Sequence, residues 1–533
     1  MKAFSVKTKS PSPPSAWRAR VSGASQCPSV ADINMSAAAF YAKMKADLAA
    51  KAAGNAASPA GGAAPAAGAA SSAAAPAPAA EETNRVAPPT VTPPNKPVLL
   101  VFGATDWDNE GKKPGMQTDE APNLMGPHRL LAGLGAAKIS FIASHCTSAH
   151  CIALAQGGGA YAWGRNESGQ LGLGDTTTRP GPVPIDSLLG SGSTVVSAAT
   201  GKAHTLFLLE GGEVHACGAS KQGCVGSKFN TRTEFEPTPI KVAGLPDGFK
   251  AGGVACGANF CLVRGAESGA WAFGWSQYGV MGNGSDGEFN KSDSSVKLSY
   301  EAQPPKPIEA FEGKEVVIVA CGASHCVAVE ANGTTYTWGY GGYGRLGHKD
   351  QNDQWRPKAI DVVRAKEVSC GAAYTAVAGY PVLRGGGVAW SAQPALYMWG
   401  RVKAASQDPW MYPKPEDELR GWAIHAMACG ASHTVVAADD SVISWGPTCL
   451  NGELGFGEGD KKSSAKPKVI DSLEGLKVAQ VACGAAHSVI LAEHDAKIVD
   501  KLPEWTPAAA PASGGDGKRK AETKPAAAKK PKK

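Results

Sequence analysis

Short apolar runs, each closed by small or turn-forming residues, recur along the middle of the chain. The first, Val98-Leu99-Leu100-Val101-Phe102-Gly103, has the pattern of a buried strand, and comparable runs continue until about Trp505. None of them approaches the roughly 18 consecutive apolar residues of a membrane-spanning helix, so we expect no membrane span. The pattern predicts a long all-β domain over residues 97–505.

Two half-units alternate within this domain. The first reads small-Cys-Gly-small-x-His followed by alternating apolar residues, and its clearest copies are Ala320-Cys321-Gly322-Ala323-Ser324-His325, Ala428-Cys429-Gly430-Ala431-Ser432-His433 and Ala482-Cys483-Gly484-Ala485-Ala486-His487. The second is a strand ending in aromatic-Gly and followed by an x-Leu-Gly turn, as in Trp163-Gly164 to Gly172 and Trp338-Gly339 to Gly347. These glycine positions account for much of the high glycine content, 65 of 533 residues.

The spacing of the histidine slot indicates the architecture. The slot falls at residues 150, 204, 260, 325, 374, 433 and 487, so consecutive slots are 49 to 65 residues apart. A unit of this length holds about four short strands with their turns. The domain begins with a lone second half-unit at Phe102-Gly103 and ends with a lone first half-unit at His487. Pairing the two ends completes a unit and removes the open sheet edges, so we predict a seven-bladed β-propeller closed by its N- and C-terminal strands.

The segments outside the propeller have a different composition. Residues 1–96 are basic and then rich in Ala and Pro, with a possible short helix at 36–53, and residues 506–533 are rich in Ala, Pro and Lys. Both are expected to be disordered, because they offer too little apolar surface to offset the entropy of ordering. The net charge of +6 conceals an asymmetry: residues 1–96 carry ten Lys or Arg against four Asp or Glu, and residues 512–533 carry eight against two.

The C-terminal lysines form two clusters that read as a nuclear-localisation signal, recognised by an importin, or as a nucleic-acid contact: Lys518, Arg519, Lys520, Lys529, Lys530, Lys532 and Lys533. They favour a nuclear protein. The basic, Ser-rich N-terminus leaves a chloroplast or mitochondrial address open as the alternative.

The repeat Trp163-Gly164-Arg165-Asn166-Glu167-Ser168-Gly169-Gln170-Leu171-Gly172, taken with the Cys-Gly-x-x-His half-unit, resembles the repeat of the regulator of chromosome condensation family. Segments such as Gly339-Tyr340-Gly341-Gly342-Tyr343-Gly344-Arg345 and Lys501-Leu502-Pro503-Glu504-Trp505 are similar to the telophase-disc branch of that family. The resemblance implies an interaction protein that binds a small GTPase of the Rac, Ral, Arf or Ran type, with chromatin, centromeres or microtubules as further partners. It also implies a candidate guanine-nucleotide exchange factor, which needs no covalent catalysis. With the basic tail, the resemblance implies a nuclear, chromosome-associated protein with a cytoplasmic or spindle pool.

The candidate partner-binding residues lie in the least repeat-like loops and turns. They are Asp106, Trp107, Asp108, Arg129, Arg165, Asp286, Glu288, Phe289, Tyr343 and Arg345. A structural chromatin or spindle adaptor without GTPase activity and an organellar propeller stay open as alternatives. We expect a monomer.

No catalytic, cofactor or metal site is predicted. The histidine slot also holds Phe260 and Tyr374, which indicates a space-filling position with a hydrogen bond where one is available. The Cys-x4-Cys pairs Cys146/Cys151, Cys256/Cys261 and Cys321/Cys326 recur with the repeat, each in a different blade, and no Cys-x2-Cys accompanies them. Because the chain shows no secretory signal, we expect the thiols to be reduced.

Overall fold

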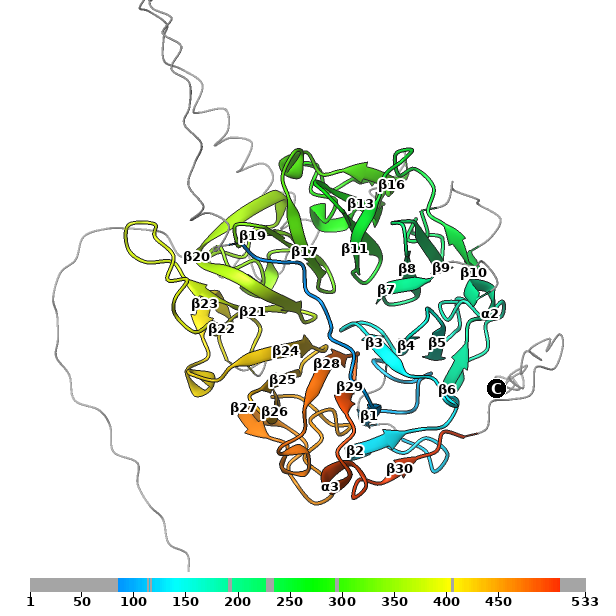
Figure 1. The fold of residues 1–533 in the computed structure, drawn as a ribbon. Helices are drawn as coiled ribbons and strands as arrows, with labels where there is room; N and C mark the ends of the chain where they lie inside the picture. Colours follow the sequence, from blue (N-terminus) through cyan, green and yellow to red (C-terminus); the bar gives the residue numbers. More distant parts are fainter. Residues whose placement is uncertain are drawn as a thin grey trace, which may run out of the picture. The chain divides into compact units, whose positions relative to one another are not determined.

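The computed structural model describes residues 85–508, apart from 113–114, 116, 190–193, 227–233, 293–296 and 404–406. The predicted helix at 36–53 and the C-terminal lysine clusters lie outside the described residues. Seven blades stand around a central channel in these ranges (Figure 1), and we number them 1 to 7 in chain order. The predicted seven-bladed propeller is confirmed.

Blades 1 to 3 are antiparallel sheets of four consecutive strands, except that a small ribbon interrupts blade 3 before its last strand. Their strands are β3 (Ile139–Ala143), β4 (His150–Ala155), β5 (Ala160–Gly164) and β6 (Arg179–Pro184); β7 (Val195–Thr200), β8 (His204–Leu209), β9 (Val214–Ala219) and β10 (Phe235–Lys241); and β11 (Ala251–Cys256), β12 (Phe260–Gly265), β13 (Ala270–Trp275) and β16 (Ala302–Pro307). The ribbon is β14 (Glu288–Asn290) with β15 (Leu298–Tyr300).

Blades 4 and 5 share one long strand, β20 (Gln354–Cys370), which pairs with β19 through its first half and with β21 through its second. The strands are β17 (Val316–Cys321), β18 (His325–Glu330) and β19 (Thr334–Gly339) in blade 4, β21 (Tyr374–Pro381), β22 (Ala395–Gly400) and β23 (Trp410–Pro415) in blade 5, and β24 (Ile424–Cys429), β25 (Thr434–Ala438), β26 (Ser441–Gly446) and β27 (Ser464–Val469) in blade 6. Short helices occupy links between strands: α2 (Asp186–Leu189), α3 (Ala496–Val499), η3 (Gln277–Gly279), η4 (Glu309–Phe311), η5 (Gly342–Gly344), η6 (Asp417–Leu419) and η7 (Asp471–Leu473). In the described part of the chain, no helix is long and apolar enough to cross a membrane.

Blade 7 closes the ring with strands from both ends of the domain. Its order is β28 (Val478–Cys483), β29 (His487–Glu493), β1 (Pro97–Gly103), β2 (Leu124–Leu130) and β30 (Glu504–Trp505). Strand β1 pairs along its whole length with β29, from Pro97 opposite Glu493 to Gly103 opposite His487. Because both neighbours of β1 are bonded, the closing blade has no open edge at the point where the two ends of the domain meet.

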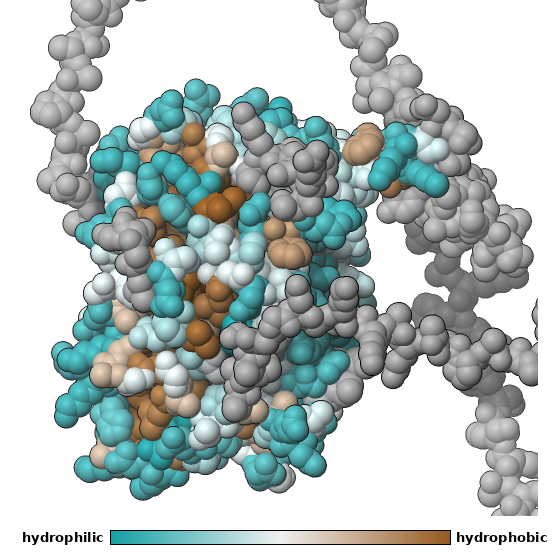
Figure 2. Space-filling view, turned by 90° about the vertical axis from the view of Figure 1, so that its right-hand side faces the viewer, coloured by the Kyte–Doolittle hydropathy of each residue, from teal (hydrophilic) through white to brown (hydrophobic). Residues whose placement is uncertain are grey.

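The core lies between neighbouring blades. Trp163, Trp338, Trp399 and Trp445, which lie at the end of the third strand of their blades, are almost fully buried. Twelve cysteines within the described ranges are free and buried. Seen from the side of β6 and β10, the surface is mainly hydrophilic, with narrower apolar strips between the polar side chains (Figure 2).

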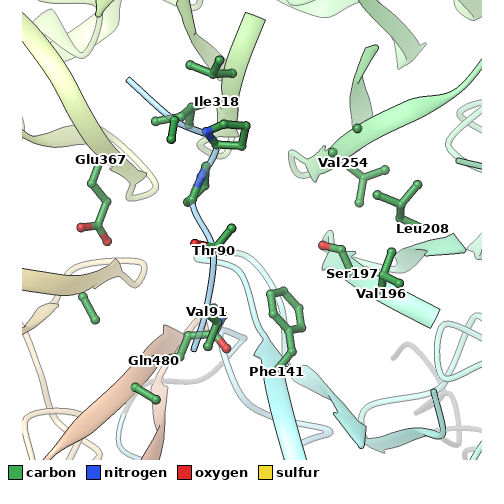
Figure 3. A pocket seen from close by; sticks show the side chains of 18 of the residues that line it. Thr90, Val91, Phe141, Val196, Ser197, Leu208, Val254, Ile318, Glu367 and Gln480 are labelled. Carbon is green, nitrogen blue, oxygen red and sulfur yellow. The ribbon is translucent and has the colours of Figure 1, made fainter. Parts of the chain in front are cut away.

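Residues 85–96, which their composition placed outside the propeller, lie across one mouth of the channel (Figures 1 and 3). Val86 is buried and its N–H donates to Ala331 O at 2.7 Å, and the N–H groups of Asn95 and Lys96 donate to the Glu493 carboxylate. Beneath this segment, which we call the strap, the channel has a volume of about 1670 Å³ and is lined by side chains of the innermost strand of every blade. Thr90 and Val91 of the strap face the wall that carries Phe141 and Gln480 (Figure 3).

Candidate functional site

The loops that carry most of the candidate residues lie at the end of the ring opposite the strap. Neighbouring strands of a blade are antiparallel, so the first-to-second and third-to-fourth strand connections share one end. We call this end the loop face; it holds the Cys-Gly-x-x-His turns and the x-Leu-Gly turns. Arg129 is the exception among the predicted residues, because it lies near the far end of β2, where its N–H and Nε donate to Pro503 O and Leu502 O. It therefore holds the C-terminal segment against blade 7.

Trp107 and Arg165 were predicted to contact a partner, but both are buried in internal contacts. The Trp107 indole N–H donates to Pro180 O at 3.1 Å, and Arg165 Nε donates to Trp107 O at 2.9 Å. The Arg165 guanidinium also donates to the carbonyl oxygens of Asp108 and Glu110. These contacts fix the loop between β1 and β2 against blade 1. In this conformation Asp106 and Asp108 are the predicted members of the loop with exposed surface.

Glu110, which the sequence analysis did not single out, is buried in the same loop. Its Oε1 accepts hydrogen bonds from Ala486 N–H and from His487 Nδ1–H, both at 2.6 Å. Burial lowers the pKa of His487, but the neighbouring Cys151 and Glu110 outweigh it and raise the pKa well above 6.5. The loop between β1 and β2 is therefore joined to the terminal blade by a buried imidazolium–carboxylate pair.

A second group of predicted residues lies on blades 3 to 5. Tyr278 stacks on Tyr340 with ring centroids 4.4 Å apart, and the Arg345 guanidinium lies 4.5 Å from the centre of the Tyr340 ring. Tyr343 follows, within 5.9 Å of Arg345 and 5.2 Å of Arg401. We call these five residues the tyrosine–arginine ladder.

The ladder combines buried support with one exposed ring. Arg345 is buried, donates to Gly342 O and Ala372 O at 2.9 Å, and burial lowers the pKa of its guanidinium. Tyr343 is 43% exposed. Tyr278 and Tyr343 both have left-handed backbone, φ 65° and 62°, which is strained for a residue with a Cβ. Strain of this kind clusters at functional sites.

The ribbon β14–β15 projects from the third-to-fourth connection of blade 3, the same connection that holds Tyr278. Phe289 on β14 is 46% exposed and Leu298 on β15 is 57% exposed. Tyr300 packs edge-on against Trp275 at 6.3 Å, and its hydroxyl donates to Glu288 Oε2 at 3.4 Å. Asp286 is partly buried just before the ribbon. Of the predicted candidates, Phe289, Glu288 and Tyr343 thus offer surface on the same side of the ring, whereas Arg345 supports it from below.

The histidine slots link each blade to the next. In six of the seven steps the slot side chain contacts the residue that follows the slot of the next blade: His487–Cys151, His150–Thr205, His204–Cys261, His325–Thr375, Tyr374–Thr434 and His433–Ser488, at 2.9–3.2 Å. Phe260 leaves the seventh step without such a bond. The predicted structural role with a hydrogen bond where one is available is confirmed, and the bond crosses between blades.

The hydroxyl partners indicate which histidine nitrogen holds the proton. Thr205, Thr375 and Ser488 donate to backbone carbonyls of the preceding blade, so each hydroxyl oxygen accepts from the imidazole Nε2–H. Burial lowers the pKa of His433 to about 3 and holds the pKa values of His150 and His325 well below 6.5. These imidazoles are neutral structural donors at physiological pH.

The glycine of Cys-Gly-x-x-His makes room for the slot ring. A Cβ on Gly322, Gly430 or Gly484 would lie 2.1, 2.0 or 1.9 Å from Cε1 of the histidine three residues later. The same geometry holds at Gly257 with Phe260 and at Gly371 with Tyr374. The motif is therefore a packing rule of the repeat.

The channel narrows toward the loop face to a section of about 280 Å³ lined by the last residues of the innermost strands. His145 of blade 1 reaches across to blade 4, where its Nε2 bonds to Cys321 O at 2.8 Å, and burial lowers its pKa to about 4. Farther round, His204, Cys256 and Cys261 place one imidazole and two thiols within 4.8 Å of one another. This is the group among the described residues that could hold a metal ion, and the sequence analysis missed it because it joins two blades.

Comparison with known proteins agrees with this architecture. Residues 157–208, 211–264, 268–329, 332–378 and 439–491 match the regulator of chromosome condensation (RCC1) repeat. Human Protein RCC2 is 36% identical over 431 residues, covering 77% of this chain and 79% of that protein, and the zebrafish RCC2 homolog is 35% identical, covering 78% and 85%.

Among solved structures, yeast Prp20p aligns with a TM-score of 0.60 at 19% identity over 79% of this chain and 96% of that chain. Human WBSCR16 aligns with a TM-score of 0.59 at 20% identity, over 75% and 99%. At these identities the structures support the propeller fold alone. The matched repeats and the similarity to Protein RCC2 over most of both chains show that this chain belongs to the regulator of chromosome condensation family.

Proposed function

We propose that this protein binds a small GTPase through the loop face and links it to chromatin or microtubules in cell division. The observation that carries the proposal is the β14–β15 ribbon, whose apolar residues Phe289 and Leu298 are exposed in the connection that also holds Tyr278 of the tyrosine–arginine ladder. Exposed apolar and aromatic side chains on a rigid scaffold are typical of binding sites. The yeast propeller Prp20p has been described for its binding to Gsp1p and histones, which supports the class of partner.

The ribbon also supports a role in nucleotide exchange. It is anchored by the Trp275–Tyr300 contact and by Ser276, whose hydroxyl donates to Glu301 O at 2.6 Å. A wedge held in this way changes the nucleotide affinity of a GTPase only if it binds the nucleotide-free form more tightly than the loaded form. A 1000-fold preference would correspond to about 4 kcal/mol, and no bond would be made or broken by this chain.

The basic tails extend the proposal to localisation. Residues 512–533 carry eight Lys or Arg against two Asp or Glu, a composition suited to an importin and to nucleic-acid phosphates. Yeast Prp20 has been solved bound to Kap60, which supports an importin-type partner. We place the protein in the nucleus and on chromosomes, and a mature N-terminus beyond residue 30 would instead support an organellar address.

A binding panel tests the GTPase proposal. Full-length protein is titrated against Rac-, Ral-, Arf- and Ran-type GTPases, each nucleotide-free and each loaded with a GTP analogue. We expect at least one nucleotide-free GTPase to bind, and the double variant Phe289→Asp/Leu298→Asp to lose at least tenfold in affinity. The matched control is Phe235→Asp, because Phe235 is 39% exposed and lies on the outermost strand of blade 2 rather than on the ribbon. If no GTPase binds, or if both variants bind equally, the proposal fails.

The concentration of positive charge in the tails supports a second candidate, a structural chromatin or spindle adaptor without GTPase activity. It predicts that deletion of residues 512–533 abolishes chromosomal localisation while the propeller shows no affinity for any GTPase. Binding through the tail should weaken steeply with salt, with a logarithmic slope of about −4 to −5 for five phosphates neutralised.

A further inference from the structure

The cluster of His204, Cys256 and Cys261 lies at the junction of blades 2 and 3. His204 is the slot residue of blade 2, and the two cysteines face each other across the β11–β12 pair at the start of blade 3. His204 Nε2 lies 3.2 Å from Cys261 Sγ, and the three ligand atoms are all within 4.8 Å of one another. All three residues are buried. The ligand types and their spacing need only small adjustments to reach tetrahedral zinc geometry, in which neighbouring ligand atoms stand roughly 3.5 Å apart.

Two other blades carry the same Cys-x4-Cys pair and differ in one feature each. In blade 4, Cys321 and Cys326 face each other in the same way, but the slot residue of the preceding blade is Phe260, which offers no ligand. In blade 1, the slot residue His487 contacts Cys151 at 3.0 Å, whereas Cys146 Sγ lies near His145. Of these three junctions, blade 3 alone brings an imidazole and both sulfurs together.

We infer that His204, Cys256 and Cys261 bind a thiophilic divalent ion of the zinc type. Two thiolates balance the charge of the ion, so the occupied site is neutral and can be buried without a large desolvation penalty. Binding would release the two thiol protons, and the imidazole would contribute a nitrogen lone pair. This inference is independent of the proposed GTPase function.

The central channel offers an entry path and a fourth ligand. Ala199, Thr200, Ala255 and Cys256 line its narrow section of about 280 Å³, so Cys256 borders space large enough for water. A metal ion entering from the channel would meet Cys256 first, and a channel water would complete four-coordination. Three protein ligands with one exchangeable position is an arrangement that zinc adopts in proteins.

The test is metal binding by the folded full-length protein. The chain is treated with a chelator under reducing conditions and titrated with Co²⁺, a coloured substitute for zinc, and zinc affinity is then measured by competition with a chromophoric chelator. We expect saturable binding with thiolate-to-cobalt charge-transfer absorption, and a rise in melting temperature with Zn²⁺. The variant Cys256→Ser/Cys261→Ser should lose at least 100-fold in affinity.

The repeat supplies matched controls. Ser or Thr already occupies the equivalent positions in other blades, for example Thr200 and Ser488, so the serine variant should remain folded. Cys321→Ser/Cys326→Ser should bind as the wild type does, and Phe260→His should add a second thiolate–cobalt site at the blade 3–blade 4 junction. Absence of saturable Co²⁺ and Zn²⁺ binding by the wild type, or unchanged binding by Cys256→Ser/Cys261→Ser, would overturn the inference.

Discussion

The buried pair of Glu110 and His487 provides the sharpest test of how the ring is closed. Glu110 Oε1 accepts two hydrogen bonds at 2.6 Å, one from the Ala486 N–H and one from the His487 ring. Glu110→Ala removes both bonds and leaves a buried imidazolium and a buried amide unpaired. Glu110→Gln keeps the shape and a carbonyl acceptor while removing the charge.

The magnitude follows from the burial of both partners. Removing one partner of a buried ion pair costs about 3–5 kcal/mol, and two charge-assisted hydrogen bonds of about 1.5–3 kcal/mol each give a similar figure. The propeller strands span residues 97–505, so at about 2.1 cal/mol/K per residue each kcal/mol lowers the Tm by roughly 1.2 °C. Glu110→Ala should therefore lower the Tm by about 4–6 °C, and Glu110→Gln by about half as much.

The pH dependence has a definite sign. Cys151 and Glu110 outweigh burial and raise the pKa of His487. Charged His487 therefore contributes its full stabilisation below pH 6.5, and this contribution declines as the pH rises through the raised pKa. The difference in melting temperature between wild type and Glu110→Ala should narrow at alkaline pH, while the part due to the unpaired Ala486 N–H remains. Hydrogen exchange should also be faster in β1 and β29 of the variant.

The control is Asp108→Asn, an exposed carboxylate of the same loop that accepts a hydrogen bond from the Thr178 hydroxyl at 2.7 Å. It should change the Tm by no more than about 1 °C, as expected for a surface substitution. A Glu110→Ala variant as stable as Asp108→Asn would refute the role of the buried pair in closure.

Further predictions concern the repeat and acid stability. Gly430→Ala should lower the melting temperature strongly, because the added Cβ would lie 2.0 Å from His433 Cε1. Gly387→Ala is the control and should leave the melting temperature unchanged, because its added Cβ would have no atom within 4 Å. Burial lowers the pKa of His145 to about 4 and that of His433 to about 3, so the unfolded chain binds more protons and stability should fall as pH decreases from 6.5 toward 4. The free energy of unfolding should fall by about 1.4 kcal/mol per pH unit for each histidine. When it is measured by chemical denaturation at several pH values, His145→Gln should reduce the slope against pH by about that amount. Equal slopes in the two proteins would contradict the assignment.

The fold was readable from the sequence because the repeat is local and periodic. Each Cys-Gly-x-x-His turn and each aromatic-Gly strand end carries its own packing constraint, and the closure followed from the unmatched half-units at Phe102 and His487. The hydrogen-bond partner of each slot histidine could not be predicted from the sequence. The partner lies about one blade further along the chain, and only the ring geometry brings the two side chains together.

The candidate site was only partly predictable. Phe289 and Tyr343 are exposed, as loop sequences of this kind suggest, but Trp107 and Arg165 look equally loop-like in sequence and are buried. Trp107 donates to Pro180 O of blade 1, and Arg165 donates to Trp107 O. Glu110 was overlooked because an acidic loop residue normally faces water. The strap was assigned to the low-complexity segment because its Pro-rich composition gives no sign of the channel that receives it.

The central claim is that the loop face binds a small GTPase through the β14–β15 ribbon. The most direct measurement is the ratio of affinities of the full-length protein for a nucleotide-free and a GTP-loaded GTPase, made with the wild type and with Phe289→Asp/Leu298→Asp. We predict a ratio well above one for at least one GTPase of the Rac, Ral, Arf or Ran type, together with a loss of at least tenfold in the ribbon variant. Absence of binding across the panel, or binding unaffected by the ribbon variant, would contradict the account.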